Sequence, residues 1–353
     1  MQTVAQGWLV LQLTNDPFIL GIVSVAQFLP VTILGLFGGV VADALPKRAG
    51  LVTTQVVSAI LALILGILTE SGHVEVWQVI GLAFLLGAVN AFDMPIRQSF
   101  VIEMVGREDI ASAVGFNSAL FNAARVVGPA IGGIVIGIVG TGVCFLINAV
   151  SFLPVIVGLL LIRPRDLRPQ ATAGRPHSAR EVGAQLAEGL RHVLVTPVIL
   201  LCVTLVGVVS LFALNNQVLL PLVARDLLGG DAATYGFLGA AMGVGSVVSS
   251  VGVALGRRPT LRLALIGSAV MGAGALCLGL SRSLPVSLLL MVAFGWGLIA
   301  LAATTNTIIQ LTVPDHLRGR VMSVYLTVFA GVSPVGALIS GTLAATEIGR
   351  AHV

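Results

Sequence analysis

Long apolar runs alternate with short polar turns along the chain. A membrane-spanning helix needs about 20 predominantly apolar residues. Ten runs reach that length, and a shorter one at the start of the chain resembles part of a span. The partial span covers 1–14, and the full spans are predicted at 18–41, 50–69, 76–95, 112–138, 142–162, 197–222, 233–254, 261–279, 285–309 and 321–344. The pattern predicts an all-α membrane protein.

Composition supports a surface that faces lipid. Of the 353 residues, 57% are hydrophobic and only 10% are charged, whereas soluble domains carry about 25% charged residues. The net charge of +4 does not indicate nucleic-acid binding, because the basic residues lie mostly in short loops between spans. Three cysteines, Cys144, Cys202 and Cys277, fall inside apolar runs and are interpreted as packing residues.

Basic residues also predict the orientation. Most Lys and Arg residues lie in alternate loops, at 42–49, 96–111, 163–196, 255–260 and 310–320, whereas the opposite loops hold only Arg225 and Arg282. Lys and Arg are enriched in cytoplasmic loops. We therefore expect a multi-pass membrane protein whose long central loop is cytoplasmic.

The long loop divides the chain into two parts. Residues 163–196 begin with a Pro- and Arg-rich segment and continue with helically spaced apolar residues, which predict a short amphipathic helix at the inner membrane surface. "MVGREDIASAV" (104–114) and "TVPDHLRGRVM" (312–322) are similar turns about 208 positions apart, and internal repeats are common in secondary transporters. The expected domains are an N-terminal bundle at 1–162, a linker at 163–196 and a C-terminal bundle at 197–346.

The repeat predicts that the chain derives from two halves of six helices each. When the halves are aligned with the offset of about 208 positions, helix 1 is partial and helix 12 is missing, so about 11 spans remain. Residues 347–353, "EIGRAHV", are polar and end the last apolar run. We interpret them as a non-native tail derived from a sequencing adapter, with a natural polar loop as the alternative.

Four segments resemble the major facilitator superfamily: "GGVVADALPKR" (38–48), "FDMPIRQSF" (92–100), "ARVVGPAIGG" (124–133) and "VPDHLRGRVMSVY" (313–325). They are most similar to the bacterial branch that includes the enterobactin exporter and macrolide efflux pumps. The resemblance implies two six-helix bundles related by a pseudo-twofold axis. It also implies a secondary active exporter of a siderophore, a macrolide or another drug-like amphiphile, with proton antiport as the energy source and no cofactor. It further implies a protein of the bacterial inner membrane, and we expect a monomer whose partners are its small-molecule substrate and the lipid bilayer.

The superfamily's loop between helices 2 and 3 matches Gly39, Asp43, Lys47 and Arg48, although Ala44 and Pro46 depart from the usual pattern. The resemblance implies that these residues form a cytoplasmic gate. The alternative is an ordinary turn with a cytoplasmic basic pair. At the end of helix 4, Asp93 and Arg97 share one helix face and are predicted to pair, and Pro95 is predicted to kink or end the helix. We assign all three to the gate, with direct proton carriage by Asp93 as a weaker possibility.

Helix 5 carries a pattern that resembles the antiporter motif of the superfamily, at Gly128, Pro129, Gly132 and Gly133. Gly128 and Gly132 form a face of small residues where another helix can come close, and Pro129 permits a bend. Arg125 lies near the middle of the same span, where a charge costs about 2.5–3.5 kcal/mol even on insertion scales. Packing does not account for this cost.

We therefore expect Arg125 to face a substrate cavity, together with Asn122 and Asn90. Other polar residues of the spans either line this cavity or bond between helices, and the sequence does not separate the two cases. They are Asn148, Asn215, Asn216, Gln217, Thr304, Thr305 and Asn306.

Other classes of function are weaker. The chain has no glycine-rich nucleotide loop, and none of its histidines falls inside a predicted span. We therefore expect no enzyme, no metal site and no direct use of ATP. The alternatives that remain are a non-transporting membrane sensor or receptor with the same fold, and an inactive truncated fragment. A membrane-embedded transferase would need paired acids or histidines inside the spans, which the sequence lacks.

Overall fold

The computed structural model describes residues 1–351 apart from residue 45 and the stretches 106–109, 164–166, 168–178 and 256–259. The described residues are helical with short connections. The N-terminal part contains α1 (Gln2–Thr14), α2 (Pro17–Ala44), α3 (Lys47–Glu70), α4 (Val76–Val105) and α5 (Ile110–Leu161). The C-terminal part contains α6 (Ala179–Val195), α7 (Pro197–Phe212), α8 (Asn216–Leu222), α9 (Ala232–Leu255), α10 (Leu261–Leu280), α11 (Leu284–Thr312), α12 (Asp315–Gly331) and α13 (Ser333–Ala351).

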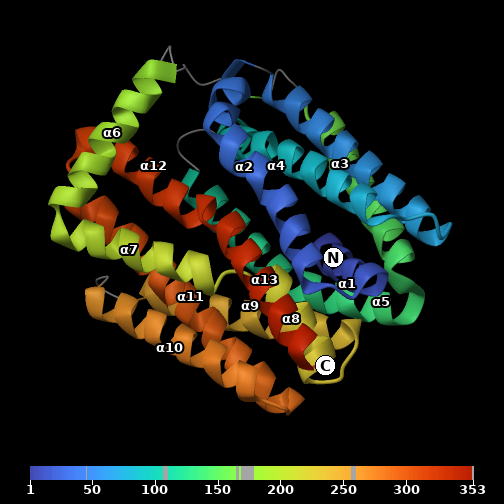
Figure 1. Cartoon of the computed structure of the whole chain (residues 1–353). Helices are drawn as coiled ribbons and strands as arrows, with labels where there is room; N and C mark the ends of the chain where they lie inside the picture. Colours follow the sequence, from blue (N-terminus) through green and yellow to red (C-terminus); the bar gives the residue numbers. More distant parts are fainter. Residues whose placement is uncertain (45, 106–109, 164–166, 168–178, 256–259, 352–353) are drawn as a thin grey trace.

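The helices form two bundles. In the first half, α2 packs against α4, and α3 packs against both α4 and α5, whereas α1 lies against α5. In the second half, α11 packs between α9 and α10 and also contacts α7. Figure 1 shows the first half in blue and green on the upper right and most of the second half, in yellow to red, on the lower left.

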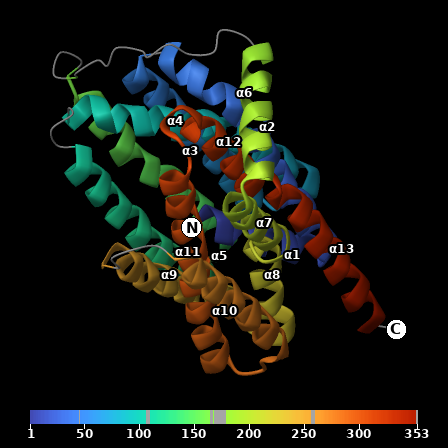
Figure 2. The same ribbon diagram turned by 90° about the vertical axis from the view of Figure 1, so that its left-hand side faces the viewer.

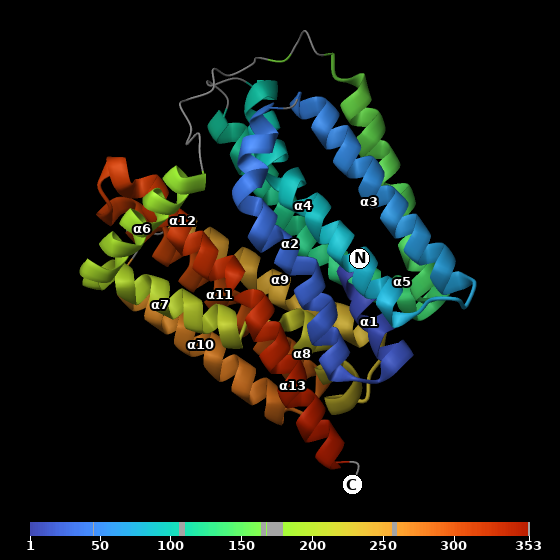
Figure 3. The ribbon, with the colours of Figure 1, turned by 45° about the horizontal axis from the view of Figure 1, so that its top comes forward.

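Helix α6 does not stand apart from the second half. It packs against α12 and α7, and Figures 2 and 3 show it running along the outside of these helices. A Cβ atom at Gly189 of α6 would lie only 2.6 Å from the backbone oxygen of Arg320 on α12. The predicted amphipathic helix is thus present and covers one end of the second half.

We call the end of the molecule where α2 ends and α3 begins the linker end, and the end where α1 ends and α2 begins the far end. The two halves meet mainly through two helix pairs, α5 with α9 and α2 with α13. Both pairs come closest at glycines. A Cβ atom at Gly133 would lie 2.5 Å from the backbone oxygen of Ala232, and one at Gly21 would lie 2.9 Å from that of Ala337.

These closest contacts lie toward the far end. Gly21 is in the first turns of α2, and Gly133 precedes the reversal of α5 at Gly140. On the partner helices, Gly236 lies one turn into α9, and Gly341 lies near the middle of α13. The halves are therefore joined by direct backbone contact at the far end.

Two predicted spans are interrupted. The span at 197–222 breaks between α7 and α8, where the Asn215 side chain donates a 2.8 Å hydrogen bond to the Leu211 backbone oxygen. Such bonds compete with the helical pattern. A π-helical turn, Val223–Leu227, then extends α8. The span at 321–344 begins earlier, at Asp315, and is interrupted at Val332. Pro334 has no backbone N–H for the Ala330 carbonyl, which explains this break.

Other boundaries differ as well. Pro95 lies inside α4 and does not end it, since the helix continues to Val105. The boundary between the spans at 112–138 and 142–162, by contrast, is as predicted, because α5 reverses between them at Gly140, where φ is +85°. That left-handed conformation favours glycine. Lys47 and Arg48, predicted in a loop, form the first turn of α3. Helix α13 continues to Ala351 rather than ending before residue 347.

The long apolar helices can be matched to the predicted spans. Among the described residues, 8 helical stretches are long and apolar enough to cross a membrane. A ninth is the bent pair Ala187–Val195 and Pro197–Phe212, whose two parts meet at 108°. The stretch Asn122–Leu161 has 40 residues, which is about twice the length that one crossing needs, so its reversal at Gly140 accommodates both predicted spans.

Candidate functional site

A cavity of about 670 Å³ lies between the two halves. Both halves contribute to its wall, through α1, α2 and α5 on one side and through α8, α9, α11, α12 and α13 on the other. Aromatic and aliphatic side chains make most of this wall, including Phe28, Tyr235 and Phe329. A cavity of this size and composition suits a drug-sized organic molecule.

Among the described residues that line this cavity, Arg125 alone has a charged side chain. Helix α5 carries it, and the residue is neither fully buried nor fully exposed. Because a charge in the middle of the membrane is costly unless it faces a cavity or a partner, the position explains how the chain accommodates it. The polar side chains on the wall are Thr3, Asn216, Gln217 and Ser333, with the Tyr235 hydroxyl.

The residues of the glycine pattern in α5 have two different surroundings. Gly128 and Pro129 line the cavity, and a Cβ atom at Gly128 would meet nothing within 4 Å. Gly132 faces Met1 of the first half, whereas Gly133 contacts Ala232 and Gly236 of α9. The predicted close approach therefore exists, but Gly133 makes it with the opposite half, and Gly128 does not take part.

Not every predicted polar residue reaches the cavity. Asn122 and Asn90 are not among the described residues that line it, so their role there stays a prediction. Asn216 and Gln217, whose role the sequence left open, do line it. Thr3 escaped the sequence analysis, because it lies in a partial span whose polar residues did not stand out from their neighbours.

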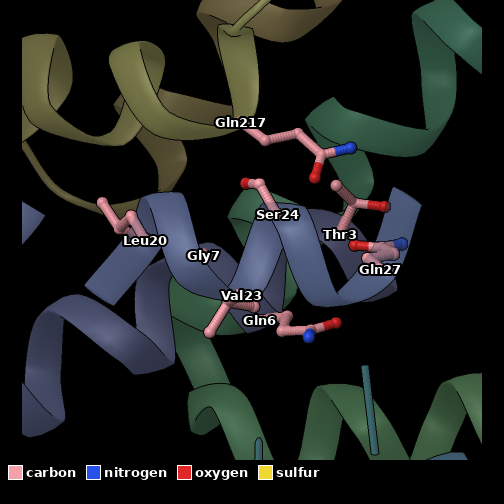
Figure 4. Close-up of a pocket in the computed structure, with 8 residues that line it drawn as sticks. All are labelled: Thr3, Gln6, Gly7, Leu20, Val23, Ser24, Gln27 and Gln217. Carbon is pink, nitrogen blue, oxygen red and sulfur yellow. The ribbon is translucent and has the colours of Figure 1, made fainter. Parts of the chain in front are cut away.

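A second, much smaller cavity of about 10 Å³ adjoins the first. Gln6 of α1 and Ser24 and Gln27 of α2 contribute to it from the first half, and Gln217 of α8 contributes from the second. Figure 4 shows Gln217 opposite Ser24 and Thr3. No charged residue is among the described residues of its wall. No residue pattern in the sequence pointed to Gln6, Ser24 or Gln27.

At the linker end, the predicted gate residues of α3 bind other helices of the first half. Lys47 forms a salt bridge with Glu103 near the end of α4. Arg48 donates hydrogen bonds to the backbone oxygens of Leu159, at 2.7 Å, and Leu160, at 2.6 Å, near the end of α5. Glu103 was not predicted, because the sequence placed the end of helix 4 before it. Gly39 and Asp43 lie in α2, where their side chains are outside the described part.

Asp93 is a buried acceptor that joins α3 to α4. Its Oδ1 atom accepts hydrogen bonds from Thr54 Oγ1, at 2.6 Å, and Gln55 Nε2, at 2.8 Å. Its Oδ2 atom accepts from Arg97 Nη2 at 2.8 Å and from Arg97 Nε at 3.0 Å. The predicted i,i+4 pair is thus present. A carboxylate with these four bonds cross-links two helices firmly, which favours a structural or gating role over proton carriage.

The far end carries a polar contact between the halves. Asn15, which ends α1 in a left-handed conformation with φ 56°, accepts a hydrogen bond from Arg225 of the π-helical turn. Arg225 also binds Asp226. Nearby, Asp231 caps α9, and the backbone N–H of Thr234, at 2.9 Å, holds the pKa of that carboxyl below its usual value.

Two helix bundles with a drug-sized cavity between them and a charged side chain in its wall define a membrane transporter of the major facilitator type. The comparison of the whole chain with known families agrees. The chain belongs to the major facilitator family described as transmembrane secretion effector, which it matches over residues 1–350.

Several curated proteins are similar over most of the chain. The multidrug efflux pump Tap of Mycolicibacterium fortuitum is 30% identical over 97% of this chain and 84% of its own length. The staphyloferrin A transporter of Staphylococcus aureus is 22% identical over 95% of this chain and 83% of its own. The macrolide efflux protein A of Streptococcus pyogenes is 21% identical over 96% of this chain and 84% of its own.

Solved structures show the same fold. The nucleoside transporter NupG matches 98% of this chain and 87% of its own with a TM-score of 0.74 at 11% identity. A bacterial homologue of the human lysosomal transporter Spinster matches 99% of this chain and 78% of its own with a TM-score of 0.72 at 15% identity. The fold-class prediction and the family resemblance are confirmed.

Proposed function

We propose that this protein exports a small organic molecule, of the siderophore, macrolide or other drug-like amphiphile class. The observation that carries the proposal is the cavity between the halves, with apolar walls and the charge of Arg125. Relatives named as a multidrug efflux pump, a staphyloferrin A transporter and a macrolide efflux protein support it. Arg125 attracts an anionic or hydrogen-bond-accepting part of the substrate, whereas the aromatic wall takes its apolar part.

The two halves rock about the cavity to give access to each side in turn, as in other secondary transporters built from repeats. The glycine contacts of α5 with α9 and of α2 with α13 close the far end in this state. The contacts of Lys47, Arg48 and Arg97 described above stay inside the first half. Both features support a state in which the substrate enters from the linker end.

We place the linker end in the cytoplasm and the protein in the bacterial inner membrane. The excess of Lys and Arg in the loops of that end supports this orientation. Inward proton flow drives the export. The antiporter-like pattern of α5 and the lack of a nucleotide-binding motif in the sequence support this energy source.

Uptake into inverted membrane vesicles that contain the full chain tests the proposal. Erythromycin and staphyloferrin A serve as probes, because relatives are named for these classes. We expect uptake of at least one probe that stops when a protonophore collapses the proton gradient. Uptake that persists without the gradient but needs ATP would contradict secondary transport. Absence of uptake of both probes, with the protein inserted, would contradict export of these classes.

A further inference from the structure

The small cavity beside the main one contains a buried donor without an acceptor. Gln6 of α1 is 3% exposed, and its Nε2 atom has no hydrogen-bond partner among the described residues. A buried donor left unpaired is costly and is normally satisfied. Gln6 therefore requires an acceptor that does not belong to the described part of the chain.

The wall of this cavity restricts which acceptor fits. Five side chains with hydrogen-bonding groups line it, and none of these is charged; they are Thr3, Gln6, Ser24, Gln27 and Gln217. The unpaired atom is a donor, so a cation does not satisfy it. The space of about 10 Å³ accommodates one water-sized group. Together these properties select a single neutral oxygen, from a hydroxyl or a carbonyl.

The small cavity borders the large one. Thr3 and Gln217 line both. Helix α1 lies close to α8 and α9 here, because a Cβ atom added at Gly7 would lie 3.7 Å from the backbone oxygen of Gln217 and 3.5 Å from the Tyr235 hydroxyl, at ordinary contact distance. The side chains of Thr3 and Gln217 therefore stand between Gln6 and a molecule held in the large cavity.

We propose that Gln6, Ser24, Gln27, Gln217 and Thr3 form a specificity subsite that binds one hydroxyl or carbonyl oxygen of the exported molecule. This inference rests on the proposed export function. The subsite lies between α1 and α2 of the first half and α8 of the second. Water occupies the subsite when the substrate lacks such a group.

Kinetics of Gln6→Leu in inverted vesicles test the subsite. Erythromycin and staphyloferrin A present hydroxyl or carbonyl oxygens, whereas ethidium contains no oxygen. For each oxygen-bearing probe that the wild type transports, we expect KM to rise about three- to tenfold, the loss expected for one neutral hydrogen bond. The maximal rate should stay within about twofold, because the leucine fills the same space.

Controls separate this role from a structural one. Gln98→Leu changes an exposed glutamine of α4 and should leave KM unchanged. Gln6→His keeps a side-chain donor and should recover part of the affinity. An unchanged KM in Gln6→Leu, or an equal rise for ethidium where it is transported, would overturn the subsite while leaving export intact. A wild type that transports none of the probes would overturn the proposed function and the subsite with it.

Discussion

Arg125 is the residue whose replacement is expected to affect transport most. It supplies the charge in a cavity wall whose other described side chains are uncharged. In Arg125→Ala, we expect transport of an oxygen-bearing or anionic probe to fall at least about tenfold, because a charged hydrogen bond is worth about 1.5–3 kcal/mol. Initial uptake rates in inverted vesicles measure the effect.

A matched arginine provides the control. Arg282 is exposed in the connection between α10 and α11, so Arg282→Ala should transport like the wild type. Arg125→Lys keeps the charge but not the planar guanidinium and should retain intermediate activity. Normal transport by Arg125→Ala at equal membrane levels would mean that the arginine has a packing role only.

Asp93 is predicted to act mainly through stability. Replacement by Asn removes the charge that binds Arg97 and places an NH₂ group among donors. Because Arg97 is nearly half exposed at 45%, we expect a loss of about 1–3 kcal/mol rather than the larger cost of a fully buried pair. Thermal unfolding of the purified protein in detergent measures it.

A double-mutant cycle isolates the pair. Arg97→Gln alone and together with Asp93→Asn should show a coupling energy near the lower part of that range. A stable Asp93→Asn variant that transports without responding to the proton gradient would contradict this view. That result would indicate that Asp93 carries the proton.

At the scale of helices, the contact of α5 with α9 depends on the absence of a side chain. In Gly133→Ala, the new Cβ atom would lie 2.5 Å from the Ala232 backbone oxygen and 2.9 Å from the Gly236 Cα atom. Backbone on both sides must then shift. We expect transport to fall several-fold and the far end to open more often. The measurement uses a cysteine introduced in the cavity wall, Ser333→Cys. An impermeant thiol reagent added from the far end should alkylate this cysteine faster in Gly133→Ala than in the parent protein.

Gly137→Ala is the matched control on the same helix, because its Cβ atom would meet nothing within 4 Å. Alanine also favours helix over glycine by about 1 kcal/mol, so this variant should be active and slightly more stable. Equal behaviour of Gly133→Ala and Gly137→Ala would show that the close approach does not limit opening.

The sequence predicted helix positions well where a long apolar run sits between polar turns, as in α3, α9, α10 and α11. It also predicted the break between 138 and 142, where the backbone of Gly140 reverses α5. It did not predict the breaks inside the spans at 197–222 and 321–344, and the first of these depends on a side-chain bond of Asn215. Likewise, Arg125 stood out as a lone charge, whereas neutral Gln6 became notable only once its burial and missing acceptor were known.

At the scale of the whole molecule, Asn15 and Arg225 join the halves at the far end. Asn15→Gly keeps the left-handed end of α1, which glycine adopts readily, but removes the amide that binds Arg225. We expect the equilibrium to shift toward opening at the far end by roughly fivefold, as for one lost hydrogen bond. Spin labels placed on α1 and α9 report the change as a distance distribution.

Asn15→Asp provides the opposite change. It retains an acceptor and adds a charge opposite Arg225, which should favour the closed far end. If Asn15→Gly and Asn15→Asp give the same distance distribution as the wild type, the bond between Asn15 and Arg225 does not influence the equilibrium between the two states.

The two halves touch most closely through main-chain atoms, at Gly21 and Ala337 and at Gly133 and Ala232, whereas aromatic side chains such as Phe28 and Phe329 shape the cavity. In the proposed exporter, substrate recognition and the motion between the halves therefore depend on different parts of the chain. Replacing Phe28 or Phe329 would change which molecules fit without altering these backbone contacts. Single substitutions in the wall can then broaden or redirect the range of substrates while the contacts between the halves stay the same.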